Sequence, residues 1–387
     1  MRYISAKHIF DGQKFLKGNP VIVLDSNNCF VELTGGESVN ELNIEYYDGI
    51  ICPGFVNAHC HLELSHMLGA IPEKTGFLNF GKSIMSQRNS FSGEEMQEAI
   101  SDNDKIMWEQ GIVAVGDISN TGDTFETKTK SNIFYHTFIE LIALNPERAE
   151  IVFMEGRKLQ AIADEKGLAS SLVPHAPYSV SGELMKRIAM DAGRREVPIT
   201  IHNQENPDED LFFKKKEGDF VEFYKFLNIP IDYFKASGLS SLQTYLPNLS
   251  SAKNLILVHN TFTPAQEIKW ANQVHRNNYW CMCPNANLYI ENKLPELKNF
   301  TDADCKIVLG TDSLASNHSL SITGEMNSLL INYKWVKIAD LLKWATHNGA
   351  EALGIGNRFG GFIKGKNAGL NYLSYKPDQL VFERKLA

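Results

Sequence analysis

The sequence lacks any hydrophobic run long enough to cross a membrane, because no window of its 387 residues approaches the ~20 apolar residues that a spanning helix needs. It also lacks an excess of basic residues: 38 Lys and Arg face 46 Asp and Glu, a formal net charge of −8. Nucleic-acid affinity depends largely on a basic surface that neutralises phosphates. We therefore predict no membrane and no nucleic-acid partner, but a small-molecule substrate. The N-terminal stretch does not resemble a secretory signal, which predicts a cytoplasmic protein.

The chain has few cysteines, and they show no disulfide framework of a small domain. The six lie at positions 29, 52, 60, 281, 283 and 305, and we expect free thiols. Cys281 and Cys283 are the one pair to weigh as a metal site. Their alternating Tyr-Trp-Cys-Met-Cys context, with no second pair at zinc-finger spacing, favours a strand instead. With 43% hydrophobic residues, the chain can bury a large core, and this excludes disorder.

The order of elements predicts an α/β fold. Short β-like runs fill the first fifty residues, and from about residue 50 each short apolar strand is followed by a helical stretch. Eight strands of this kind end near His59, Asp117, Glu140, His175, His202, His259, Pro284 and Asp312. Residues 324–336 and 338–353 are predicted helices, and the tail returns to strands. We predict a (β/α)₈ TIM barrel over residues 51–354, with a small β-sandwich formed by residues 1–50 and 355–387.

Seven of the eight strands end on a histidine or a carboxylate, and such strand ends converge on the mouth of a barrel. His59 and His61 are spaced i, i+2 in an extended run, so both imidazoles leave the same face of the first strand. His202 and Asp312 end two further strands. Three nitrogens and one oxygen suit zinc or ferrous iron, which predicts a metal site.

Several segments resemble the motifs of the amidohydrolase superfamily and occur in its order from residue 53 to about 354. They are Pro53 to Ser65, Pro174 to Ser181, His202-x-x-Glu205, Leu257-Val-His259, Cys283 to Asn287 and Gly310 to Ser313. Within that superfamily the chain is similar to the aminohydrolases that deaminate purines, pterins and triazines. The string His61-Leu-Glu-Leu-Ser65 is similar to the aminodeoxyfutalosine deaminases of menaquinone synthesis.

The resemblance implies His59, His61, His202 and Asp312 as ligands of one divalent ion, Zn²⁺ or Fe²⁺. Binuclear members bridge two ions with a carboxylated lysine on the fourth strand, but here that strand ends on Val173-Pro174-His175 without a lysine. By resemblance, His259 hydrogen-bonds the attacking water. Glu205 moves protons between water, ring nitrogen and ammonia, and Asp312 also orients the water. The implied enzyme hydrolyses carbon–nitrogen bonds as a cyclic amidine deaminase, and the resemblance is compatible with a homodimer.

The substrate contacts follow from weaker signals. A helix predicted from Phe77 to Arg88 lies over the mouth, so that Phe80 can stack on a heterocycle and Arg88 can pair with a substrate carboxylate. His175 either contacts substrate or supports the site, and Glu63 either faces the pocket or forms a salt bridge beneath it. Asp117 and Glu140 are expected to hydrogen-bond neighbouring loops.

Aminodeoxyfutalosine, which carries a benzoate carboxylate, is the favoured substrate of a 6-aminopurine deaminase. Several alternatives stay open: a deaminase of S-adenosylhomocysteine, methylthioadenosine or guanine, a cyclic amide hydrolase, a chlorohydrolase, or a catalytically silent barrel that binds a metabolite or partner.

Overall fold

The centre of the molecule is an eight-stranded parallel barrel, as predicted; the computed structural model describes residues 1–38 and 43–387. Its strands are β5 Phe55–Cys60, β6 Ile112–Ser119, β7 Phe134–Leu141, β8 Ala169–Pro174, β9 Ile199–Asn203, β10 Leu255–His259, β11 Asn278–Met282 and β12 Lys306–Leu309. Hydrogen bonding orders them β5-β6-β7-β8 in one half and β9-β10-β11-β12 in the other. Backbone hydrogen bonds of 3.0 Å, from His202 N to His175 O and from Thr311 N to His59 O, close the two seams between the halves.

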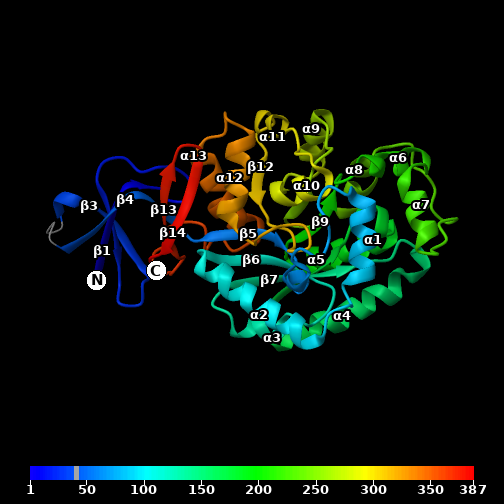
Figure 1. The fold of residues 1–387 in the computed structure, drawn as a ribbon, viewed down its shortest axis with the longest axis horizontal. Helices are drawn as coiled ribbons and strands as arrows, with labels where there is room; N and C mark the ends of the chain where they lie inside the picture. Colours follow the sequence, from blue (N-terminus) through cyan, green and yellow to red (C-terminus); the bar gives the residue numbers. More distant parts are fainter. Residues whose placement is uncertain (39–42) are drawn as a thin grey trace.

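Helices surround the barrel (Figure 1). They are α1 Phe77–Gln87, α2 Gly93–Glu109, α3 Phe125–Lys130, α4 Ala149–Glu165, α5 Gly182–Arg195, α6 Pro207–Lys215, α7 Asp219–Phe226, α8 Ser241–Tyr245, α9 Ala265–Val274, α10 Pro284–Glu291, α11 Leu297–Asp302, α12 Ile322–Asn332, α13 Ile338–Lys343 and α14 Gly349–Ala352. A π-helical turn, Trp344–Asn348, joins the last two into the single helical stretch that the sequence predicts. The helix expected over residues 324–336 instead begins at Ile322, because the Ser321 side chain caps it by accepting from Gly324 N at 3.2 Å. Among the described helices, none combines the length and apolar character that a bilayer crossing requires.

Both ends of the chain form one six-stranded sheet beside the barrel, drawn in blue and red in Figure 1. Its strands are β1 Arg2–Ile9, β2 Pro20–Leu24, β3 Phe30–Gly35, β4 Ile44–Pro53, β13 Leu370–Lys376 and β14 Gln379–Lys385. The order is β14-β13-β4-β1-β2-β3, so the C-terminal strands pair with an N-terminal one. The sheet has a small core of its own, which includes Ile4, Ile22 and Leu370. The proposed division at residues 50 and 355 stays a prediction.

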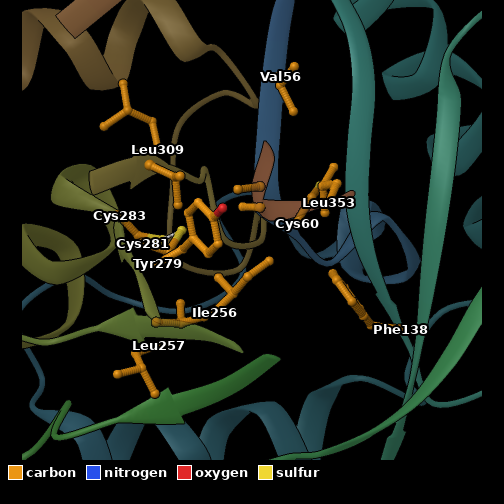
Figure 2. Packing of buried hydrophobic residues seen from close by; sticks show 14 of the residues in the cluster. Val56, Cys60, Phe138, Ile256, Leu257, Tyr279, Cys281, Cys283, Leu309 and Leu353 are labelled. Carbon is orange, nitrogen blue, oxygen red and sulfur yellow. Dashed lines mark hydrogen bonds between the residues drawn. The ribbon is translucent and has the colours of Figure 1, made fainter. Parts of the chain in front are cut away.

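The barrel core is apolar and tightly filled. Figure 2 shows Val56, Phe138, Ile256 and Leu309, which come from four different strands, and each is 0% exposed. Strand β11 carries Cys281 and leads to Cys283, so this run is a strand as predicted. The two buried sulfurs lie 4.0 Å apart as free thiols.

Candidate metal centre and active site

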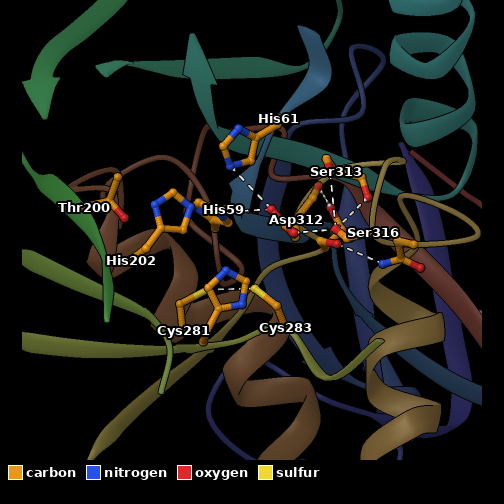
Figure 3. Close-up of polar contacts among 12 residues, drawn as sticks. His59, His61, Thr200, His202, Cys281, Cys283, Asp312, Ser313 and Ser316 are labelled. Atoms are coloured by element: carbon orange, nitrogen blue, oxygen red, sulfur yellow. Dashed lines mark hydrogen bonds and ion pairs between the residues drawn. The ribbon is translucent and has the colours of Figure 1, made fainter. Parts of the chain in front are cut away.

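Four of the residues at the barrel mouth offer donor atoms to a common point. One ligand atom from each of His59, His202, His259 and Asp312 lies within 4.8 Å of the others, and all four residues are buried. His61 directly follows β5, and its Nε2 lies 3.4 Å from Asp312 Oδ1, while His59 Nε2 lies 3.5 Å from the same oxygen (Figure 3). The structure thus brings together the four residues implied as metal ligands and adds His259 beside them.

The protonation states of this cluster suit a divalent cation. Desolvation lowers the pKa of His61 to about 3 and that of His202 well below its usual value, so both imidazoles are neutral and offer lone pairs. Burial alone would raise the pKa of Asp312, but the imidazoles of His59, His61 and His259 around its carboxylate hold it well below its usual range. Both ring nitrogens of His59 are buried without a hydrogen-bond partner among the described residues. Neutral nitrogens with one carboxylate are a donor set that zinc and ferrous iron accept.

Neighbouring groups orient these donors. His202 Nδ1 donates to the backbone oxygen of His175 at 2.7 Å, which leaves Nε2 with its lone pair. Ser316 donates its hydroxyl hydrogen to Oδ2 of Asp312, so that the other carboxylate oxygen faces His59 and His61. Sequence reasoning missed Ser316, although it lies four residues after Asp312.

The backbone at the site is held in an uncommon conformation. His259, Asn260 and Asp312 have φ angles of 71°, 59° and 57°, in the left-handed region that residues other than glycine rarely adopt. The Asn260 side chain fixes this turn by donating to Leu257 O at 2.8 Å and to Cys281 O at 3.1 Å. Such conformations persist only where surrounding contacts enforce them, and they are concentrated at functional sites.

His259 and Glu205 form a second, adjoining pair. His259 Nε2 lies 3.5 Å from Glu205 Oε1, and both side chains are buried. Desolvation raises the pKa of Glu205 to about 7, although His259 opposes the shift. His259 Nδ1 donates to Asn287 Oδ1 at 2.9 Å, so its Nε2 keeps a lone pair on the side of Glu205. Asn287 lies in the segment Cys283 to Asn287 that carries part of the family resemblance, but its sequence position alone does not predict this contact.

The Asn287→Leu variant is expected to lower kcat by about 10–100-fold with a smaller change in KM, because His259 loses the acceptor that fixes its tautomer. Steady-state kinetics on metal-loaded protein measure this. Asn287→Asp keeps an acceptor oxygen at the same place and serves as the matched control, with most of the turnover retained. An equal loss in both variants, or a loss confined to KM, would contradict this role for Asn287.

Two strand-end carboxylates bind protein groups, as predicted. Asp117 Oδ1 accepts from Leu62 N at 2.8 Å, and its Oδ2 lies 2.6 Å from Lys128 Nζ, with both side chains 0% exposed. Glu140 accepts from the Asn120 side chain at 2.9 Å, and its other oxygen lies 3.7 Å from His202 Nδ1. The Asp117–Lys128 pair thus fixes the backbone at Leu62, the residue that directly follows His61.

Lys128→Met is expected to lower the free energy of unfolding by about 3–5 kcal/mol, because it leaves the Asp117 carboxylate buried without its cation. Urea unfolding of the purified protein gives this value. In the double variant Asp117→Asn, Lys128→Met no charge remains, and the amide oxygen can still accept from Leu62 N. It should therefore be more stable than Lys128→Met alone, and a double variant that is less stable would disprove the explanation.

The predicted substrate contacts surround the mouth. His175 is half-buried, and its Nδ1 lies 2.6 Å from Ser179 Oγ. Phe80, on α1, packs with Ile84 against a cluster of Leu64, Met67, Ile71 and Ala315. Arg88 lies 3.8 Å from the buried carboxylate of Glu63, its guanidinium side chain 34% exposed. Glu63 Oε2 in turn accepts from Asn120 N at 2.9 Å, so Glu63 has protein partners on both sides.

The fold and the cluster at its mouth define a class of enzyme. A model of the amidohydrolase family matches residues 50–385, and the chain belongs to this family. It is a hydrolase that acts on carbon–nitrogen bonds.

Two relatives of known name and one solved structure share 25% or less of their aligned residues with this chain. An adenosine deaminase of Helicobacter pylori is 25% identical over 321 residues, which are 81% of this chain and 76% of the relative. An aminodeoxyfutalosine deaminase of Nitratiruptor is 25% identical over 319 residues, 79% of this chain and 75% of the relative. The crystal structure of H. pylori aminofutalosine deaminase with methylthio-coformycin has a TM-score of 0.81 at 22% identity. It covers 97% of this chain and 93% of that one, which shows the shared fold.

Proposed function

We propose that this protein is a metal-dependent hydrolytic deaminase of 6-aminopurine nucleosides, with aminodeoxyfutalosine as its substrate. The observation that carries the proposal is the buried His259–Glu205 pair beside a cluster of neutral imidazoles and one carboxylate. Such a site has proton-transfer groups directly beside a metal-binding donor set. Relatives named adenosine deaminase and aminodeoxyfutalosine deaminase support the same substrate class.

His59, His61, His202 and Asp312 would hold the ion. A zinc or iron ion bound there would lower the pKa of water to about 7 and would thereby supply a nucleophile at neutral pH. No lysine follows β8, whose last residue Pro174 precedes His175, and this favours a single ion. The donor set accepts either metal.

The protein's own groups would then move the protons. His259, with its Nδ1–H held by Asn287, presents Nε2 as an acceptor for a hydrogen bond from the attacking water. Glu205, whose pKa is about 7, can take a proton from the water and give it to the ring nitrogen next to the attacked carbon. A second transfer to the amino group breaks the C–N bond. One water enters and one ammonia leaves, so the purine amine becomes a carbonyl.

The remaining mouth residues would bind the substrate. His175 uses Nδ1 toward Ser179, so its Nε2 is available to the heterocycle. Phe80 offers an aromatic surface on the helix over the mouth. Arg88 would pair with the benzoate carboxylate of aminodeoxyfutalosine and, at 3.8 Å, would share its charge with Glu63.

The test measures ammonia released when metal-loaded protein is incubated with aminodeoxyfutalosine, adenosine and methylthioadenosine. The highest kcat/KM is expected for aminodeoxyfutalosine, and Arg88→Met should reduce that preference. A higher kcat/KM for adenosine or methylthioadenosine would support deaminase activity but would rule out aminodeoxyfutalosine as the preferred substrate. Failure to release ammonia from any of the three would overturn the proposal, and hydrolysis of a cyclic amide or a carbon–halogen bond would then replace it.

A further inference from the structure

Helix α4 presents apolar side chains to solvent that the barrel does not need. Its inner face, with Val152, Gly156 and Ala163 buried, already packs on the barrel, and a side chain at Gly156 would meet Leu141 at 2.5 Å. On the outer face Ile151 is 56%, Met154 48% and Ile162 47% exposed. The inner face accounts for the contact with the barrel, so the outer apolar residues require another explanation.

The outer face also has the spacing of a helix-pairing surface. Starting at the cap residue Arg148, exposed side chains recur at alternating intervals of three and four residues. In chain order these residues, which we call the α4 seam, are Arg148, Ile151, Glu155, Lys158, Ile162 and Glu165. Positions spaced in this way form one stripe along a helix, and two such stripes can pack against each other.

The charges of the seam have no partner in the described part of the chain. Arg148, Glu155, Lys158 and Glu165 form no ion pair there, and their side chains donate and accept no hydrogen bonds within it. Four charged residues beside the seam differ, because each of them has an ion-pair partner. Those pairs are Glu150 with Arg187, Arg157 with Asp191, Asp164 with Arg195 and Lys166 with Glu126. The unpaired charges therefore coincide with the exposed apolar stripe.

The seam is complementary to itself when one copy is reversed. In an antiparallel pair related by a twofold axis between Gly156 and Arg157, Arg148 faces Glu165 of the other copy, and Ile151 faces Ile162. At the centre Glu155 faces Lys158 of the other copy twice. A parallel pair would instead set Glu155 against Glu155 and Lys158 against Lys158, which repel.

We propose that the α4 seam docks antiparallel on the α4 seam of a second copy of this chain and forms a twofold dimer. Such an interface is isologous, so one patch must complement itself, as this one does. The helix spans about 25 Å, which suits the centre of an interface of roughly 800 Å² per partner. Met190 on α5 is 52% exposed beside Asp191, the partner of Arg157 on α4, and adds apolar area next to the seam.

Sedimentation equilibrium of the full chain, with charge-reversal variants, tests the proposal. The unmodified protein should be a dimer, and Glu155→Lys or Lys158→Glu alone should raise the dimer Kd more than about 100-fold, because each sets like charges opposite each other twice. The double variant Glu155→Lys, Lys158→Glu restores opposite charges and should return Kd to within about tenfold of the original. These side chains are exposed, and circular dichroism verifies that the variants fold.

Glu98→Lys on α2 is the matched control, since Glu98 is also an exposed helical glutamate without an ion pair among the described residues, and its Kd should not change. Several results would overturn the proposal: a monomeric unmodified protein, a dimer that both single variants leave intact, or a double variant that does not recover. Deaminase activity is measured separately, so failure here leaves the proposed function in place.

Discussion

Glu205→Gln is expected to lower kcat by about 10²–10⁴-fold while the bound metal stays at its original level. Glutamine has nearly the same shape and stays near His259, but it cannot take a proton from water or pass one to the ring nitrogen. Glu205 is not among the implied ligands, which explains why the metal should remain. Steady-state turnover and elemental analysis of the same sample measure the two quantities together.

Glu209→Gln is the matched control for this variant. Glu209 lies four residues further along, is 0% exposed, and has its pKa raised to about 8 by desolvation. Its Oε1 accepts hydrogen bonds from Ser241 and from Gln204 N, which an amide oxygen can also accept. Turnover in Glu209→Gln should be close to that of the unmodified protein. Unchanged turnover in Glu205→Gln would disprove the proton transfer.

Asp312→Asn is expected to weaken metal binding by at least about 100-fold and to lower turnover as well, because it removes the only anionic donor of the implied set. Chelator competition gives the affinity, and turnover at saturating metal shows what remains once the site is filled. Loss of turnover with unchanged metal affinity would show that Asp312 orients the water without binding the ion.

Asp304→Asn provides a control at the same backbone geometry. Asp304 and Asp312 have φ angles of 50° and 57°, so the two substitutions replace the same residue type in the same left-handed conformation. Asp304 is exposed and lies outside the mouth. Its variant should leave both metal affinity and turnover unchanged.

The barrel and the residues at its mouth could be predicted because the barrel topology determines where the end of each strand lies. A parallel barrel sends the carboxyl ends of all its strands to one place, so a histidine or carboxylate at a strand end has a known destination. His59, His202, His259 and Asp312 follow this rule, and the structure sets them within 4.8 Å. Alternation along the first strand was enough to add His61.

The residues that support these groups could not be predicted in the same way. Asn287 reaches His259 from α10, and Ser316 reaches Asp312 by folding back from the next turn. Which loop residue lies behind which strand end depends on loop conformation, and no periodicity encodes it. The pairing of Arg88 with Glu63 is of the same kind, since the two residues lie in separate loop and helix segments. The α4 seam could not be identified from sequence either, because only the structure shows which face of that helix is exposed.

The N-terminal connection between the chain-end sheet and the barrel consists of one residue. β4 ends at Pro53 and β5 begins at Phe55, so Gly54 alone separates the two strands, and a side chain there would meet Val113 at 2.4 Å. β13 pairs with β4 up to Pro53 itself. Pairing with the C-terminal strand β13 therefore fixes the start of β5, the strand that carries His59. Trimming either end of the chain to obtain a minimal barrel would release the strand that carries His59 and leads directly to His61.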